Sequence, residues 1–143
     1  MPFTTKYEFE EIAYGTTGWN AIVTDNFDEV DAYLNTYLRY PTASGEVIAE
    51  GDALCIHNEH FKQAKADGIL QPAVGFAIEE STSGEYVRAK RCGQVTNTGW
   101  NLSGSGEIWL HPTTLGGITQ TEPVSNAQRL GAAIATTKII VQL

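Results

Sequence analysis

The stretch GEVIAEGDALCIH, residues 45–57, decides the expected fold, because from Gly45 on the sequence changes to β-branched residues and partial alternation of apolar and polar side chains, punctuated by glycines. Alternation with a period of two residues is typical of a β-strand that buries one face. The same pattern returns in AVGFAIEE (73–80), GEYVRAKRCGQV (84–95), GEIWLHP (106–112), QRLGAAIA (128–135) and TTKIIVQL (136–143). These short segments predict a mainly β fold, a small antiparallel β-barrel or sandwich that occupies residues 45–143.

The β region also contains a weak two-fold internal repeat. GDALCIH (51–57) resembles GEIWLH (106–111), and AVGFAI (73–78) resembles RLGAAI (129–134). We therefore expect the two halves to share a strand plan, with a glycine inside a strand marking a bulge or a close backbone approach. The segment NEHFKQAKADGILQP (58–72) is expected to form one helical turn or a loop, and STSG, NTGWNLSGSG and TLGG are expected to be turns.

Before the β region, the stretch GTTGWNAIVTDNFDEVDAYLNTYL (15–38) predicts a single α-helix over about residues 19–38. Threonines and a glycine offer N-cap candidates, and Pro41 forces the backbone out of the helical region. The apolar residues step by 4, 3, 4 and 3 along one stripe, and they are Val23, Phe27, Val30, Leu34 and Tyr37. Residues 1–44 are thus expected to be an arm and an amphipathic helix, whose stripe packs either on the chain's own β domain or on neighbouring copies.

Length, composition and charge exclude several classes of protein. A chain of 143 residues with 42% hydrophobic residues fits one domain with an appendage. The formal net charge is −8, and residues 1–40 hold seven acidic and two basic residues, so no nucleic-acid partner is expected. No apolar run approaches the roughly 20 residues that cross a bilayer, so no membrane association is expected. The start, MPFTTKYEFEE, lacks the pattern of a secretory signal, which predicts synthesis in the cytoplasm.

The residues that could hold a metal are Cys55, His57 and His60, a C-x-H-x-x-H cluster that would need a fourth ligand such as His111 or Cys92. Cys55 and His57 would share a face of a strand, which makes a zinc site geometrically possible. The cluster nevertheless lacks the C-x-x-C and H-x-x-x-H spacings of closed zinc sites. We therefore expect no structural metal and no cofactor.

No segment has the pattern of a catalytic motif. Ser105 lies between two glycines but leads into a strand, and no phosphate-binding glycine loop is present. The acidic residues Glu79 and Glu80 lie beside turns, where solvated carboxylates are expected. Trp19, Trp100 and Trp109 could line a sugar site or anchor a core or an interface. We therefore expect a non-enzymatic protein.

Two segments resemble known proteins. YGTTGWNAIVTDNFDEVDAYL (14–34) is similar to G-T-T-x-W-x-x-x-L-N-x-N-F-x-x-L-D, a pattern of fibre and other appendage proteins of tailed bacteriophages. The matching residues are Gly15, Thr16, Thr17, Trp19, Asn26, Phe27 and Asp31. AQRLGAAIATTKIIVQL (127–143) looks like the closing hairpin of small phage virion domains. The resemblance covers about a quarter of the chain closely and the rest only as a general β plan.

The resemblance implies a structural protein of the virion in which the helix trimerises or docks. The expected interface consists of Trp19, Val23, Phe27, Val30, Leu34 and Tyr37. A trimeric capsid decoration, or cement, protein is expected, with itself and the major capsid protein or another virion protein as partners, on the head surface rather than the tail. The alternatives are a short tail-fibre or tail-tip protein that binds a host-surface glycan, and a small zinc-dependent or sugar-active enzyme.

Overall fold

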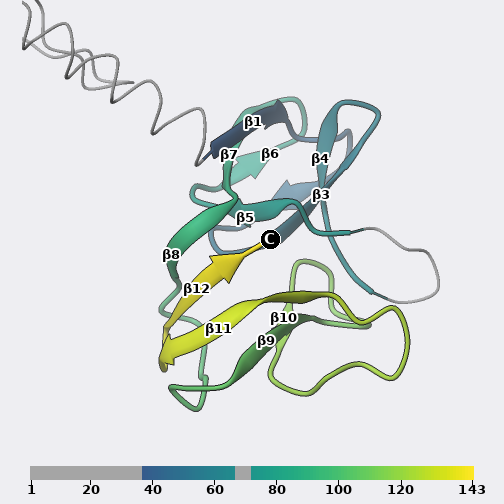
Figure 1. The fold of residues 1–143 in the computed structure, drawn as a ribbon. Helices are drawn as coiled ribbons and strands as arrows, with labels where there is room; N and C mark the ends of the chain where they lie inside the picture. Colours follow the sequence, from purple (N-terminus) through teal and green to yellow (C-terminus); the bar gives the residue numbers. More distant parts are fainter. Residues whose placement is uncertain (1–36, 67–71) are drawn as a thin grey trace, which may run out of the picture. The chain divides into compact units, whose positions relative to one another are not determined.

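The computed structural model describes residues 37–66 and 72–143, and this part of the chain is mainly β and contains no helix. Its strands form two five-stranded antiparallel sheets and a two-stranded ribbon (Figure 1). The strands are β1 Tyr37–Pro41, β2 Val47–Ile48, β3 Ala53–His57, β4 His60–Gln63, β5 Gly75–Ala77, β6 Ser81–Thr82, β7 Tyr86–Lys90, β8 Cys92–Thr96, β9 Glu107–Leu110, β10 Ile118–Thr119, β11 Arg129–Ala135 and β12 Lys138–Gln142. The mainly β, antiparallel fold predicted from the sequence is therefore confirmed.

The first sheet has the strand order β1-β7-β5-β3-β4 and curls until its two outer strands meet. Thr42, directly after β1, forms a parallel bridge with Phe61 of β4, and the N–H of Ala43 donates to the Phe61 carbonyl at 3.0 Å. The interior of the curl holds Ile48, Leu54, Phe61, Ala77, Val87 and Ala89. Each large side chain buried there stabilises the fold by about 1.5–3 kcal/mol.

The second sheet has the order β10-β9-β11-β12-β8 and repeats the plan of the first. Taken in chain order, β1, β3, β4, β5 and β7 of the first sheet correspond to β8, β9, β10, β11 and β12 of the second. In both sheets the strand that comes first in the chain lies at one edge, beside the strand that comes last in the chain. The strands that come second and third in the chain lie at the other edge. The similar segments in the sequence fall on the corresponding strands β3 and β9, and β5 and β11.

A second core lies where the two sheets pack together. Ala53 and Phe76 from the first sheet share a buried cluster with Ile108, Leu130 and Ile139 from the second. Alternate residues of β3 therefore serve two cores, because Leu54 points into the curl while its neighbour Ala53 points toward the second sheet. The near-continuous burial of ALC in β3 follows from this double packing.

The start of the β domain differs from the prediction. Tyr37 and Leu38, which the expected helix included, belong instead to β1. The register of β1 against β7 is antiparallel, with Tyr37 opposite Lys90 and Leu38 opposite Ala89. Leu38 packs against the core of the curl, so the segment follows the two-residue period of a strand. The compact unit that holds the β-strands begins at Tyr37. β1 therefore belongs to the β domain, although the sequence assigned residues 1–44 to the arm and helix.

Three further expectations are wrong in detail. The segment 58–72 was expected to be a helical turn or loop, but its start forms β4, which pairs with β3. The two strands are joined at Asn58 and Glu59, both with positive φ (50° and 59°), as in the tight turns of β-hairpins. STSG begins with β6 rather than being only a turn, and GEYVRAKRCGQV divides into β7 and β8, which lie in different sheets.

Gly131 in β11 marks a close approach of two backbones. A Cβ atom added at this position would lie 1.9 Å from the carbonyl oxygen of Ile140 on β12. The pairing of β11 with β9 also shifts register between Arg129 and Gly131, which indicates a bulge. The glycine predicted from the sequence to mark a bulge or a close approach does both.

Candidate interaction surfaces

The expected interface residues fall on both sides of the boundary of the described structure. Trp19, Val23, Phe27, Val30 and Leu34 lie outside the described residues, so their role in an interface stays a prediction. Tyr37 is described and lies at the start of β1, half-buried, and its role in an interface likewise stays a prediction. Its ring faces two cationic side chains of β7, with Arg88 Cζ at 5.9 Å and Lys90 Nζ at 6.0 Å from the ring centroid.

Basic and aromatic side chains alternate on the outer surface of β1 and β7. Leu38 and Tyr40 of β1 and Val87 and Ala89 of β7 belong to the core of the curl, so the residues between them face outward. We call this outward surface the β1–β7 face, and it consists of Tyr37, Arg39, Tyr86, Arg88 and Lys90. This face was not predicted from the sequence, although every second residue of YLRYP and YVRAK is basic or aromatic except Pro41.

Two contacts order this surface. The guanidinium of Arg39 lies over the ring of Tyr86, with Cζ 4.3 Å from the centroid, although 57% of Tyr86 remains exposed. Arg88 donates from Nε to Glu79 Oε1 and from Nη2 to Glu79 Oε2, both at 3.2 Å. The same Glu79 Oε1 accepts the backbone N–H of Arg88 at 2.9 Å. Glu79 therefore fixes the side chain of Arg88 and neutralises its charge.

The pKa of Glu79 reflects this pairing. Partial burial alone would raise the pKa, but the hydrogen bonds from Arg88 and the positive charges of Arg88 and Arg39 together hold it below its ordinary value. Glu79 is therefore ionised at neutral pH, and the ion pair contributes stability that is lost as the pH falls through the lowered pKa. Because about a third of each side chain is exposed, solvent screening keeps this contribution small.

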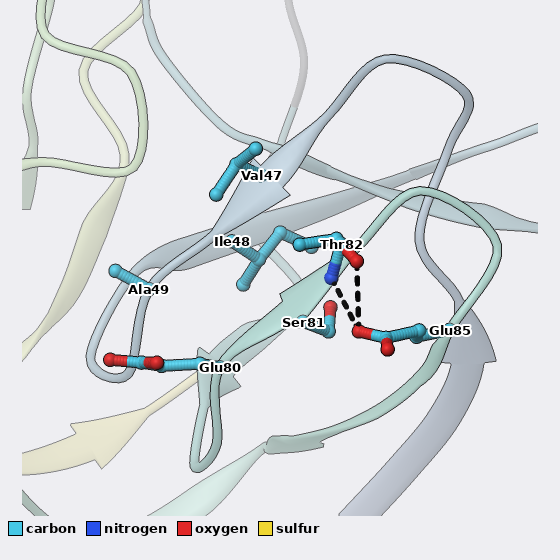
Figure 2. Close-up of a pocket in the computed structure, with 7 residues that line it drawn as sticks. All are labelled: Val47, Ile48, Ala49, Glu80, Ser81, Thr82 and Glu85. Atoms are coloured by element: carbon cyan, nitrogen blue, oxygen red, sulfur yellow. Dashed lines mark hydrogen bonds between the residues drawn. The ribbon is translucent and has the colours of Figure 1, made fainter.

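A separate groove of about 450 Å³ lies along the ribbon of β2 and β6 (Figure 2). Its lining consists of Val47, Ile48, Ala49, Glu80, Ser81, Thr82 and Glu85. The carboxylate of Glu85 accepts hydrogen bonds from the N–H of Thr82 at 2.8 Å and from its hydroxyl at 3.0 Å. These two hydrogen bonds lower the pKa of Glu85 and hold the turn between β6 and β7.

The remaining polar groups of the groove are not arranged as an acid–base pair. Figure 2 shows the carboxylate of Glu80 extending away from that of Glu85. Ser81 is buried, and its hydroxyl is hydrogen-bonded to that of Thr42. The groove thus shows the contacts of a structural turn.

The structure separates the cysteine and histidines of the candidate zinc cluster. The Cys55 side chain is buried between the two sheets, where burial raises the pKa of its thiol. His57 and His60 lie opposite each other on the exposed β3–β4 hairpin. His111 accepts hydrogen bonds at Nδ1 from the N–H groups of Thr113 at 3.2 Å and Thr114 at 2.9 Å, which occupies one ring nitrogen. Among residues 37–66 and 72–143, no three metal-ligating side chains are grouped to hold an ion.

The tryptophans do not form a common sugar-binding surface in the described part of the chain. Trp100 packs against the core between the sheets, in an edge-to-face contact with Phe76 at 6.1 Å. Trp109 is half-buried in β9, on the sheet face opposite its core-forming neighbours Ile108 and Leu110. Trp19 lies outside the described residues.

Comparisons of the chain with known protein families, with characterised proteins and with solved structures find no match. The described residues include no helix with the length and apolar character needed to cross a bilayer.

Proposed function

We propose that this protein is a non-enzymatic structural protein of a tailed-bacteriophage virion, most simply a trimeric capsid decoration protein that stabilises the head. The observation that carries the proposal is the resemblance of residues 14–34 to the recurring segment of phage appendage proteins. A second observation supports it. The C-terminal segment, which resembles the closing hairpin of small virion domains, contains the antiparallel pair β11 and β12.

In this proposal the chain has two parts with different tasks. The arm and amphipathic helix before the β domain dock on the capsid and bring copies together through Trp19, Val23, Phe27, Val30 and Leu34. The β domain, with its two repeated sheets, covers the joint between neighbouring capsid subunits. Three linked copies multiply the effective concentration of the docking segments, so each copy needs only a modest interface.

A short tail-fibre or tail-tip protein is the second candidate. The exposed Tyr86, at the opposite end of the β1–β7 face from Tyr37, favours this candidate, because aromatic faces suit the apolar faces of sugar rings. In that case the protein would lie on the tail and contact a host-surface glycan.

Particles made with and without the protein distinguish the two functions. A protein that binds only the assembled capsid stabilises that state by mass action. For the decoration protein we expect particles without it to release their genome at lower temperature and after milder osmotic shock, while adsorption to host cells is unchanged. Particles that are as heat-resistant as wild type but fail to adsorb would reject the decoration function and favour the tail-fibre candidate.

A further inference from the structure

Within the described residues, the two halves of the outer side of the first sheet differ. On β3 and β5, Ala53, Cys55 and Phe76 face the second sheet and are buried. On β1 and β7 the same side of the sheet carries the β1–β7 face, where Arg39 and Tyr86 are exposed. On this side of the sheet Arg39 and Tyr86 therefore remain exposed, on strands that lie beside the strands packed against the second sheet.

The charges of this surface are only partly balanced. Glu79 pairs with Arg88, but no carboxylate of the described residues forms an ion pair with Arg39 or Lys90. The surface thus concentrates positive charge on a chain whose formal net charge is −8. A local charge opposite in sign to the whole chain favours a specific anionic partner over general attraction to anions.

The contact of Arg39 with Tyr86 prepares the guanidinium for binding. Stacking over the ring at 4.3 Å restricts the side chain and leaves the N–H donors at the edge of its plane. A planar guanidinium held in this way can donate two parallel hydrogen bonds to a carboxylate. Lys90 adds a second positive charge across the strand pair, opposite Tyr37. Less side-chain entropy is then lost when an anion binds.

We propose that the β1–β7 face docks an acidic polypeptide segment of a partner protein, with Arg39 and Lys90 binding its carboxylates and Tyr86 packing against its backbone or apolar side chains. Charge complementarity identifies the partner's chemistry. A nucleic acid fits less well, because binding a phosphate backbone needs many clustered cations. The proposal concerns a surface of the β domain and does not depend on the virion function.

Fluorescence anisotropy at low salt tests the proposal, with the full chain and fluorescein-labelled hexaglutamate as the probe. Hexaglutamine and a short oligothymidylate serve as comparison probes. We expect hexaglutamate to bind and hexaglutamine not to bind. The double variant Arg39→Gln/Lys90→Gln should weaken binding of hexaglutamate by about tenfold or more, since it removes two cations of the face that form no ion pair with a described carboxylate. Added salt should weaken binding by the native chain.

The matched control is Lys138→Gln, which removes an exposed cation from β12 of the second sheet and should leave binding unchanged. Circular dichroism checks that each variant is folded. The proposal is overturned if hexaglutamate binds no better than hexaglutamine, or if the double variant binds as well as the native chain. It is also overturned if Lys138→Gln causes the same loss, or if the oligothymidylate binds more tightly than hexaglutamate.

Discussion

Replacing Gly131 with alanine should break the pairing of β11 with β12, because no space exists for a methyl group between the two backbones. The added Cβ would lie 1.9 Å from the carbonyl oxygen of Ile140, 2.9 Å from its carbon and 3.2 Å from the Cα of Val141. A relaxed contact between carbon and oxygen is about 3.3 Å or longer. The strands would have to separate by more than 1 Å at this point, and all three contacting atoms belong to the backbone.

The loss of stability caused by Gly131→Ala follows from the contacts that would be disturbed if β11 and β12 separated. Gly131 lies opposite Val141 on one side and Ile108 on the other, and all three are buried. Two ladder hydrogen bonds left unmade in a buried sheet cost about 3 kcal/mol or more. For a domain of this size that lowers Tm by roughly 12 °C. Thermal unfolding followed by far-ultraviolet circular dichroism measures the shift.

Gly84→Ala is the matched control. Gly84 has φ +82° in the exposed turn before β7, and a Cβ there would meet nothing within 4 Å. The same substitution should cost only the strain of a left-handed alanine, about 1 kcal/mol. If Gly131→Ala proves no more destabilising than Gly84→Ala, the close approach of β11 and β12 is wrong.

Three further predictions concern the thiols, the Glu79 ion pair and assembly. In the folded protein, a thiol reagent should label exposed Cys92 and leave buried Cys55 unlabelled, and mass spectrometry after digestion would reveal any labelling of Cys55. Glu79→Gln should destabilise the protein by less than about 1 kcal/mol at pH 7, and it should reduce the loss of stability as the pH falls from the ordinary pKa of a glutamate through the lowered pKa of Glu79. An identical acid dependence in urea unfolding would contradict the lowered pKa. Sedimentation should show a homotrimer. Phe27→Asp should abolish the trimer, because it places an unpaired charge in the apolar stripe of the expected helix, whereas a monomer at high concentration would contradict assembly through this stripe.

The strands that could be predicted from the sequence are those with a strong two-residue period. Val87 and Ala89 alternate with Arg88 and Lys90, and this alternation identified β7 without any knowledge of its neighbours. β1 was harder, because Tyr37 and Leu38 also continue the 3–4 spacing of the apolar residues before them. The pairing with β7, which is distant in the sequence, selects the two-residue period of a strand over the 3–4 spacing of a helix.

The hairpin of β3 and β4 was missed for a local reason. Asn58 is a common residue at positive φ, but Glu59 is not, so the turn lacks the Asn-Gly pair that identifies such hairpins. The β1–β7 face could have been noticed from the alternating basic and aromatic residues. That β1 and β7 are neighbours, which brings Arg39 over Tyr86, follows only from the topology of the sheet.

The most direct test of the proposed function is the position of the protein in intact virions. Immunogold labelling of purified particles, with particles lacking the protein as the control, locates it on the head or on the tail. The decoration function predicts label distributed over the head surface, and cryo-electron microscopy should then show three-fold density at the joints between capsid subunits. Label confined to the tail tip, or absent from the particles, would contradict it.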